Sequence, residues 1–287
     1  MPVEYEERGL ENVDHQTASD EEIVTWCLRW RDNIIATGLG RERLLSSTSN
    51  LLVRLNKYAL VKFGSSVTAS EAANQQYACQ VFDRCGTVVV PQVYRYIEVL
   101  STTICNVSGR VGFLVMEYIH ATKGTDLSPS NLSSCLRDVA CAIAMMWQRT
   151  REIPGPVDMG EPRGPLWAPD NRAYQHFHSS SDLETLLNCA LRKEESSIDL
   201  QGVSYVFCHL DLAARNVLVD KSTVYLIDWA CAGFYPRFFE IWALRLSRVH
   251  STDFSSALSS RLPPMTKTEE EQIHTLWQSY RLRMLHG

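Results

Sequence analysis

One stretch, residues 208–235, restricts the fold more than any other part of the sequence: CHLDLAARNVLVDKSTVYLIDWACAGFY. Its two short apolar runs, NVLVD and VYLID, are separated by a Lys221-Ser222 turn and predict a β-hairpin. Asp211 precedes the first run, Asn216 begins it, and Asp228 closes the second. A single Asp at a strand end is usually a turn or cap residue. The hairpin would hold Asn216 and Asp228 at a fixed separation, and hard oxygen donors of this kind also suit a metal ion.

The rest of the chain divides into a strand-rich first part and a mainly helical second part. Residues 1–125 predict a sheet of about five strands, formed by a hairpin at Leu51–Phe63 with its turn at Asn56-Lys57 and by strands at 88–100 and 111–119. Two helices are predicted in the same part, at 21–37 and 69–82. The second part predicts four helices, at 132–149, 181–191, 239–249 and 269–285. Between them, residues 153–180 are rich in Pro, Gly and aromatics, which is typical of an irregular and often functional segment.

The motifs HLDLAARN (209–216), LIDW (226–229) and AGFYP (232–236) together resemble the aminoglycoside phosphotransferase family, especially its fungal small-molecule and secondary-metabolite members. The resemblance spans roughly residues 45–250. Protein kinases carry Phe-Gly after the second acid and an A-P-E element downstream, whereas this chain has Trp229-Ala230 and no A-P-E. The resemblance implies an α+β, bilobal kinase-like fold. It divides the chain into an acidic lead-in and helix (1–40), a nucleotide-binding N-lobe (41–120) and a helical C-lobe (121–287).

The resemblance also implies the catalytic roles. Asp211 corresponds to the carboxylate that orients the acceptor hydroxyl and takes its proton, while Asn216 and Asp228 correspond to the Mg²⁺ ligands. Lys62, in the strand YALVKF, corresponds to the cation on the ATP phosphates, and Glu71 to its ion-pair partner. His209 is interpreted as a structural support of the loop.

The remaining nucleotide contacts are also read through the resemblance. The chain has no G-x-G-x-x-G before Lys62, and Ser47, Ser49 and Asn50 form either a phosphate-binding loop or a surface turn. The resemblance assigns Glu117 and Ile119 to the hinge strand that faces adenine. It assigns four further residues to the roof and floor of the adenine slot, although such residues are more often core: Val53, Leu60, Leu218 and Ile227.

The acceptor site is expected within residues 153–205 and the C-terminal helices. Candidate contacts are Trp167, Tyr174, Arg215 and Glu240, with a local ion pair as the alternative for Arg215. Trp167 and Tyr174 fall in an aromatic cluster with the triplet 176–178, His-Phe-His, which lacks the Cys or acid partners of a zinc site. The region also lacks an acidic run, so a hydroxyl-bearing metabolite is favoured over a polycationic aminoglycoside.

Composition narrows the class of protein further. The net charge is −5, and residues 1–22 carry eight acidic and one basic side chain, so no dense basic face for nucleic acid is indicated. Nine cysteines without a C-x-x-C pair, set among apolar residues, favour buried thiols in a reducing compartment. The start, MPVEYEERGL, does not read as a signal peptide, and the longest apolar run, residues 139–147, is too short for a membrane span.

The sequence therefore predicts a cytoplasmic, ATP- and Mg²⁺-dependent phosphotransferase that acts on a hydroxyl of a small metabolite. Its only expected partner is that substrate, with no nucleic acid or membrane, and the chain is expected to be a monomer or a weak homodimer. Two alternatives stay open: a kinase-fold enzyme that uses ATP for a dehydration or condensation, and a nucleotide- or metabolite-binding scaffold without transfer activity.

Overall fold

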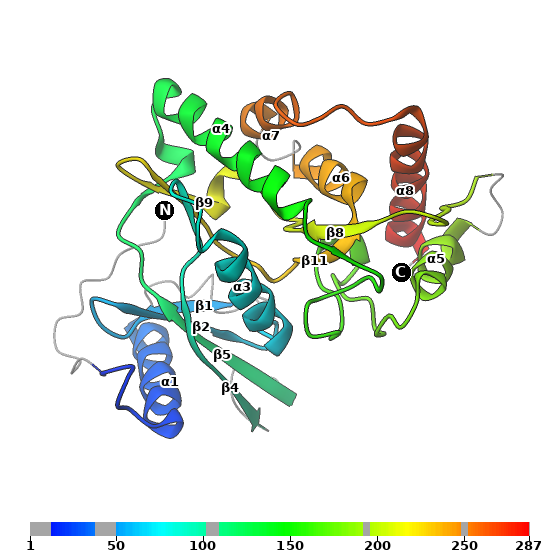
Figure 1. Ribbon diagram of the computed structural model, residues 1–287. Helices are drawn as coiled ribbons and strands as arrows, with labels where there is room; N and C mark the ends of the chain where they lie inside the picture. Colours follow the sequence, from blue (N-terminus) through cyan, green and yellow to red (C-terminus); the bar gives the residue numbers. More distant parts are fainter. Residues whose placement is uncertain (1–12, 38–49, 102–108, 192–195, 248–251, 287) are drawn as a thin grey trace. The chain divides into compact units, whose positions relative to one another are not determined.

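The computed structural model describes residues 13–37, 50–101, 109–191, 196–247 and 252–286 (Figure 1). The chain divides into two compact units, and each is described by itself. Unit 1 comprises Met1–Val67 and Val93–Ile119, and unit 2 comprises Thr68–Gln92 and His120–Gly287. By this division the helix at residues 69–82 packs with the helical unit. The predicted N-lobe boundaries of 41 and 120 stay a prediction from sequence.

Unit 1 is built on an antiparallel sheet with the strand order β1-β2-β5-β4. Its elements are α1 (Asp20–Thr37), β1 (Leu51–Arg54), β2 (Ala59–Gly64), β4 (Val93–Ser101) and β5 (Gly109–Glu117). The predicted hairpin at 51–63 is confirmed as β1 and β2. Its turn is held by Asn56, whose Oδ1 accepts hydrogen bonds from the backbone N–H of Tyr58 at 2.8 Å and of Ala59 at 3.0 Å.

The core of unit 1 lies between α1 and the sheet. Ile23 and Cys27 are fully buried one helical turn apart, which is the spacing that puts two side chains on one face of a helix. They belong to the same buried cluster as Phe63 and Phe113, whose rings stack with centroids 5.2 Å apart. The helical pattern of residues 21–37 thus becomes one apolar face packed on the sheet.

Unit 2 contains two further sheets, with strand orders β3-β10-β9-β6 and β11-β8-β7. The strands are β3 (Val88–Val89), β6 (Thr122–Lys123), β7 (Thr150–Arg151), β8 (Tyr205–Cys208), β9 (Val217–Asp220), β10 (Thr223–Leu226) and β11 (Gly233–Pro236). The sequence places residues 88–89 in one sheet of about five strands with β1, β2, β4 and β5. The structure corrects this: β3 pairs in parallel with β10, and the first sheet has four strands.

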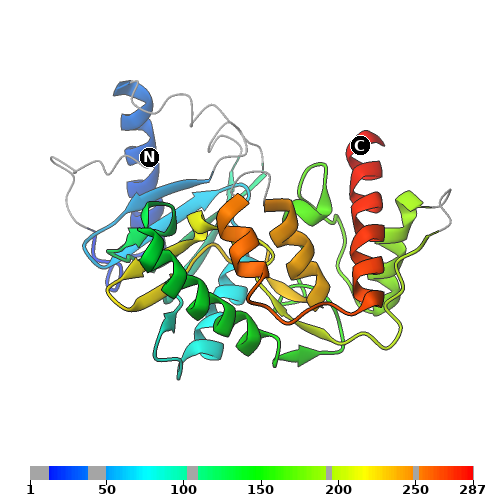
Figure 2. The ribbon, with the colours of Figure 1, turned by 90° about the horizontal axis from the view of Figure 1, so that it is seen from above.

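The helices of unit 2 surround these sheets. They are α3 (Ala69–Phe82), α4 (Pro129–Met146), α5 (Ser180–Asn188), α6 (Arg237–Ser247), α7 (Thr252–Ser259) and α8 (Lys267–His286). Helices α4, α7, α6 and α8 contact one another in that order, as Figures 1 and 2 show. Among the described residues, no helix is both long enough and apolar enough to cross a membrane.

The core of unit 2 connects α4 to the strands around residues 208–235. Leu136, Val139, Ile143 and Met146 recur at helical spacing on α4, and each is at most 2% exposed. In the same cluster, Phe207 of β8 stacks on Trp229, with ring centroids 5.8 Å apart. The Trp that follows Asp228 is therefore a core anchor, and it fixes the chain directly after that carboxylate.

Candidate active site

The segment 208–235 folds so that both of its acidic positions are set by neighbouring strands. β8 ends at Cys208, a short 3-10 turn covers Ala214–Asn216, and β9 and β10 form the predicted hairpin. β11 then returns antiparallel to β8, with Gly233 opposite Cys208. A backbone hydrogen bond of 3.1 Å from Ile227 to the Asn216 carbonyl joins the two ends of the hairpin. The loop with Asp211 and the loop with Asp228 are thus held by one framework.

Asn216 fixes the Asp211 carboxylate by its side-chain amide. Its Nδ2 donates hydrogen bonds to the backbone carbonyl of Asp211 and to Asp211 Oδ2, both at 2.8 Å. Because the amide nitrogen is used in this way, Oδ1 is the atom of Asn216 that suits a hard cation. The structure therefore brings together two of the three predicted residues in a geometry that leaves a carboxamide oxygen for a metal.

Arg215 forms an ion pair with Asp211, from Nη2 to Oδ1. The Arg215 side chain is 53% exposed, and an exposed pair of this kind contributes little to stability. The pair is the local alternative that the sequence left open for Arg215. A contact of Arg215 with the acceptor stays a prediction.

His209 links the two loops. Its Nδ1 accepts a hydrogen bond from the Asp211 backbone N–H at 3.2 Å, so Nε2 carries the proton and donates to the Ile227 carbonyl at 3.1 Å. Burial lowers the pKa of this imidazole, and the neutral form fits the pattern of one acceptor and one donor. The centroid of the His209 ring also lies 4.5 Å from that of the Trp229 ring. The supporting role predicted for His209 agrees with these contacts.

Both loops contain a residue in the left-handed backbone region. Leu210, directly before Asp211, has a φ of 60°, and Asp228 has a φ of 68°. For residues other than Gly, Asn and Asp this conformation costs roughly 1–3 kcal/mol, as at Leu210, and persists only where the surroundings hold it. Such strain is concentrated at functional sites. Here it occurs at the residue before Asp211 and at Asp228 itself.

Glu240 of α6 holds the strained turn at Leu210. Its side chain is fully buried, and its carboxylate accepts from the His209 N–H at 2.6 Å and from the Leu210 N–H at 3.3 Å. The sequence assigns Glu240 to the acceptor site. The structure corrects this assignment, because the carboxylate is fully buried and is bound to the backbone of the loop, which it supports.

The pH dependence of stability tests this role. Burial raises the pKa of Glu240 from 4.5 to about 7, against the opposing effect of its two backbone hydrogen bonds. A raised folded-state pKa gives a stability contribution that is complete below pH 4.5 and is lost as the pH rises to about 7. We expect Glu240 to lower the free energy of unfolding by roughly 3 kcal/mol across this range. Glu240→Gln should remove that component.

The measurement is urea unfolding of both proteins at intervals between pH 4 and 8. The difference between the two curves is the quantity of interest, because other titrating groups cancel in it. A difference that stays constant with pH would contradict a raised pKa at Glu240, whatever the stability of the variant.

Asn74 of α3 is a supporting residue that sequence reasoning missed. It is fully buried, and its Nδ2 donates to the carbonyls of Trp229 at 3.2 Å and Ala232 at 2.7 Å. Its Oδ1 accepts from the Val157 N–H at 2.9 Å. Asn74 thereby ties α3 to the turn after Asp228 and to the irregular segment. A carboxamide on the apolar face of a predicted helix was the available signal.

The predicted nucleotide contacts fall in both units. Unit 1 contains Lys62 (8% exposed, on β2), Asn50, Val53, Leu60, Glu117 and Ile119, and unit 2 contains Glu71, Leu218 and Ile227. In unit 1 the sheet register sets Ala59 opposite Glu117 and Leu60 opposite Met116, so Leu60 and Glu117 lie near one another. In unit 2, Glu71 is 1% exposed on α3. Ser47 and Ser49 lie outside the described residues.

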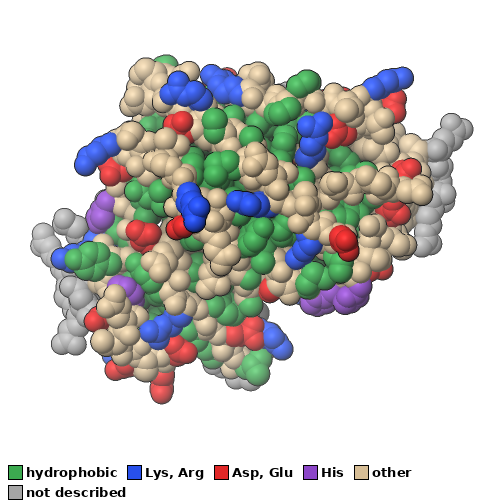
Figure 3. All heavy atoms as spheres, in the orientation of Figure 1, with side chains coloured by type: hydrophobic (Ala, Val, Ile, Leu, Met, Phe, Trp, Pro, Cys, Tyr) green, Lys and Arg blue, Asp and Glu red, His purple; other side chains and the backbone are tan. Residues whose placement is uncertain are grey.

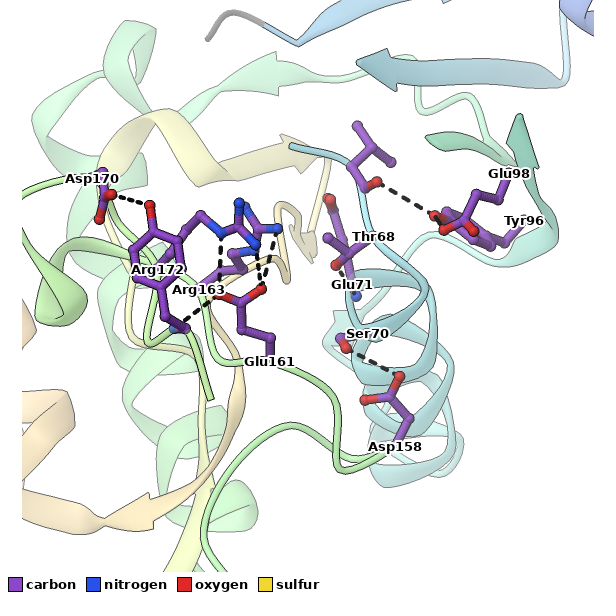
Figure 4. A network of polar contacts seen from close by, with 12 residues as sticks. Thr68, Ser70, Glu71, Tyr96, Glu98, Asp158, Glu161, Arg163, Asp170 and Arg172 are labelled. Carbon is purple, nitrogen blue, oxygen red and sulfur yellow. Dashed lines mark hydrogen bonds and ion pairs between the residues drawn. The ribbon is translucent and has the colours of Figure 1, made fainter. Parts of the chain in front are cut away.

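The predicted aromatic acceptor cluster separates into buried and exposed members. Trp167 is 1% exposed and packs on Phe177 and Tyr235, with ring centroids 5.6 and 6.0 Å away. The structure therefore corrects its assignment as a contact residue, because it is part of the core. Tyr174 is 64% exposed, and its hydroxyl donates to Asp170 (Figure 4).

The triplet 176–178 was also considered as part of a zinc site. The Nδ1 atom of His176 lies 2.8 Å from the Met159 carbonyl oxygen. Within the described part of the chain, no group of three or more His, Cys, Asp or Glu side chains is arranged to hold a metal ion.

On the face drawn in Figure 3, Lys and Arg side chains are interspersed with Asp and Glu.

The strand-rich unit, the helical unit and the paired acidic loops define a kinase-like fold of the α+β class. The model of the phosphotransferase enzyme family matches residues 41–281, and the chain belongs to this family. No curated protein matches the chain.

Solved structures to which the chain is similar have low sequence identity. A candidate fructosamine-3-kinase from Haemophilus somnus 129PT is 14% identical, with 84% of this chain and 81% of that chain covered and a TM-score of 0.52. A microcompartment-associated aminopropanol kinase is 18% identical, with coverage of 84% and 81% and a TM-score of 0.48. A thermostable mutant of the aminoglycoside phosphotransferase APH(4)-Ia is 13% identical, with coverage of 82% and 85% and a TM-score of 0.49.

Proposed function

We propose that this protein is an ATP- and Mg²⁺-dependent phosphotransferase that acts on a hydroxyl group of a small metabolite. One observation carries the proposal: Asn216 clamps Asp211 at 2.8 Å while Asp228 is held at a φ of 68°, and His209 hydrogen-bonds to both loops. A rigid pair of acidic loops suits phosphoryl transfer, in which catalysis consists mainly of positioning and charge stabilisation. Membership of the phosphotransferase enzyme family supports the same reaction class.

The roles in this mechanism follow from the side chains. Asp211 orients the acceptor hydroxyl and accepts its proton, because its carboxylate is fixed by Asn216 and lies on the loop after β8. Asn216 Oδ1 and the Asp228 carboxylate would hold Mg²⁺, since both are hard oxygen donors. When bound, the ion supplies positive charge that screens the phosphate oxygens. Glu240 and His209 keep the loops in their strained conformations.

Lys62 and Glu71 are proposed as the pair that positions the ATP phosphates. Lys62 is only 8% exposed in an apolar strand, and a buried ammonium is retained where it has a defined ionic role. We expect Lys62→Ala to weaken ATP binding by about 10- to 100-fold, the loss typical of one charged hydrogen bond. If Glu71 acts through Lys62, the double variant with Glu71→Ala should lose much less than the sum of the single losses. Calorimetric titration with MgATP of all four proteins measures this, and additive losses would show that the residues act independently.

The reaction itself is tested by ³¹P NMR. The protein is incubated with ATP, Mg²⁺ and a panel of small hydroxyl compounds that includes alcohols, sugars and hydroxy acids. The proposal requires a new phosphoester signal that grows with ADP. Free phosphate beside an altered organic product would indicate ATP-driven dehydration or condensation. Unchanged ATP with every compound would favour a binding scaffold.

A further inference from the structure

A small, partly open cavity in unit 2 lies beside the candidate active site. It has a volume of about 10 Å³, which is space for one water-sized group. Residues 163–166 line one side, Leu210 and Cys231 come from the two loops of the active site, and α6 contributes the rest. Leu210 directly precedes Asp211, and Cys231 lies three residues after Asp228. The cavity therefore borders both acidic loops from within the same unit.

The backbone of the irregular segment places Arg163 at the edge of this cavity. Arg163 pairs with Arg172 in an isolated β-bridge, and the Gly164 N–H donates to the Asn171 carbonyl at 3.1 Å. Gly164 has a φ of 117°, and a Cβ atom there would lie 2.6 Å from Cys231 Sγ. Only glycine permits this backbone conformation and this approach. The close contact fixes the neighbouring Arg163 against the turn that follows Asp228.

Two residues that line the cavity have buried N–H groups without a partner among the described residues. They are Nε of Arg163 and Nε1 of Trp242, which is itself 1% exposed. Buried donors are nearly always hydrogen-bonded in folded proteins. Two residues with such donors line one cavity, and a group with acceptor oxygens would suit them.

Arg163 shares the carboxylate of Glu161 with Arg172, and Asp170 also acts on its charge. Its nearest acid, Glu161, accepts two hydrogen bonds from Arg172, at 3.1 and 2.8 Å, and one from the Tyr174 N–H at 2.9 Å (Figure 4). Arg163 Nη2 forms an ion pair with Glu161 Oε2 at 3.6 Å, which is longer than a hydrogen bond. Burial, and next the charge of Arg172, lower the pKa of Arg163. A negatively charged ligand would balance this cation, whereas a cationic one would be repelled.

We propose that this cavity receives a carboxylate of the acceptor, so that the substrate of the phosphotransferase is a small hydroxy acid. This inference rests on the proposed function. One carboxylate oxygen accepts from Arg163 Nε and Trp242 Nε1, and the rest of the molecule extends along Leu210 towards Asp211. A carboxylate can place one oxygen in this space of one water while its carbon and second oxygen stay outside it.

Acetate is the probe for the cavity, and the Trp242 indole N–H signal is the readout. Trp242→Phe identifies this signal in the ¹H–¹⁵N spectrum of the full chain. We expect a saturable shift with sodium acetate and none with acetamide or with sodium chloride at equal ionic strength. Arg163→Met should weaken acetate binding at least tenfold, and Arg163→Lys, which keeps the charge but lacks Nε, should weaken it less. Arg137→Met, an exposed arginine on α4, is the matched control and should bind as the wild type does.

The outcomes separate this inference from the proposed function. A shift that depends on Arg163 supports the carboxylate site even if no phosphoester forms, in which case the proposed function alone fails. Conversely, phosphorylation of neutral alcohols at equal rates by the wild type and Arg163→Met would overturn the inference and keep the function. The absence of any acetate-dependent shift would mean that the cavity holds only water, and this also overturns it. Arg163→Lys keeps the test valid if Arg163→Met does not fold.

Discussion

Replacing Asp211 with Asn is expected to lower kcat by about 10²- to 10⁴-fold, the usual contribution of a positioned acid–base group. This equals about 3–5 kcal/mol of activation free energy. The substitution keeps the shape of the side chain and an oxygen that can still accept from Asn216 Nδ2. It also keeps the 2.8 Å hydrogen bond from that amide to the backbone carbonyl of residue 211. What it removes is the basic oxygen that takes the hydroxyl proton.

ATP affinity should change little in the Asp211→Asn variant, because its proposed ligands are elsewhere. The measurement is kcat with the identified acceptor beside calorimetric ATP affinity on the same preparation. Asp220→Asn is the matched control, since Asp220 is an exposed residue at the end of β9 with no proposed role. A kcat near the wild-type value in Asp211→Asn would rule out the catalytic base. Equal losses in both variants would point to a general effect on charge.

Elements with complete local signals could be predicted closely from the sequence. The predicted helix at 69–82 coincides with α3, which begins where the Thr68 hydroxyl accepts from the Glu71 N–H at 3.2 Å. The β1–β2 hairpin was predictable because the side chain of Asn56 accepts two of the hydrogen bonds in its turn. In each case the residues that determine the structure lie within a few positions of one another, so a short stretch of sequence is enough to predict the element.

Pairings between distant segments could not be predicted in this way. Val88 and Val89 read as part of the first sheet, yet they pair with Val224 and Tyr225 of β10. Nothing local distinguishes the two pairings, because both bury an apolar strand. The helix α7 was also missed, since Thr252–Ser259 is short and rich in serine. Its place is set by contacts with the preceding helix α6 and with α4, which is far away in the sequence.

The candidate site shows the same division. Asp211, Asn216 and Asp228 were found from the spacing within one hairpin, whereas their supports come from elsewhere. Glu240 reaches the loop from 31 residues away, and Asn74 reaches the Trp229 carbonyl across 155 residues. Both had a weak signal, a polar side chain among apolar neighbours on a helix. Burial of such a group requires hydrogen-bond partners, but the sequence does not say which ones.

Asp228 should be indispensable for Mg²⁺-dependent ATP binding, and Asp228→Asn is the variant that isolates its charge. At a φ of 68° most residues are strained, but Asn tolerates this region well, so the backbone should persist. Asp228→Ala removes the same charge and adds backbone strain of about 1–2 kcal/mol. If the carboxylate is a metal ligand, both variants should lose Mg²⁺-dependent ATP binding, and the alanine variant should lose more, because the carboxamide oxygen of Asn keeps an uncharged donor. Only the alanine variant should also lose stability.

The readout is the difference between ATP affinities in Mg²⁺ and in EDTA, measured by calorimetry for the wild type and both variants. This difference reports the metal, whereas a merely structural role of Asp228 would change both affinities together. Thermal unfolding of the same samples without Mg²⁺ separates strain from charge. It measures the stability of the fold, which backbone strain at residue 228 would lower in the absence of the ion. An Asp228→Ala protein that keeps the wild-type difference would show that the metal is held by other oxygens. The strained φ at this position would then serve the fold alone, through the packing of Trp229 on Phe207.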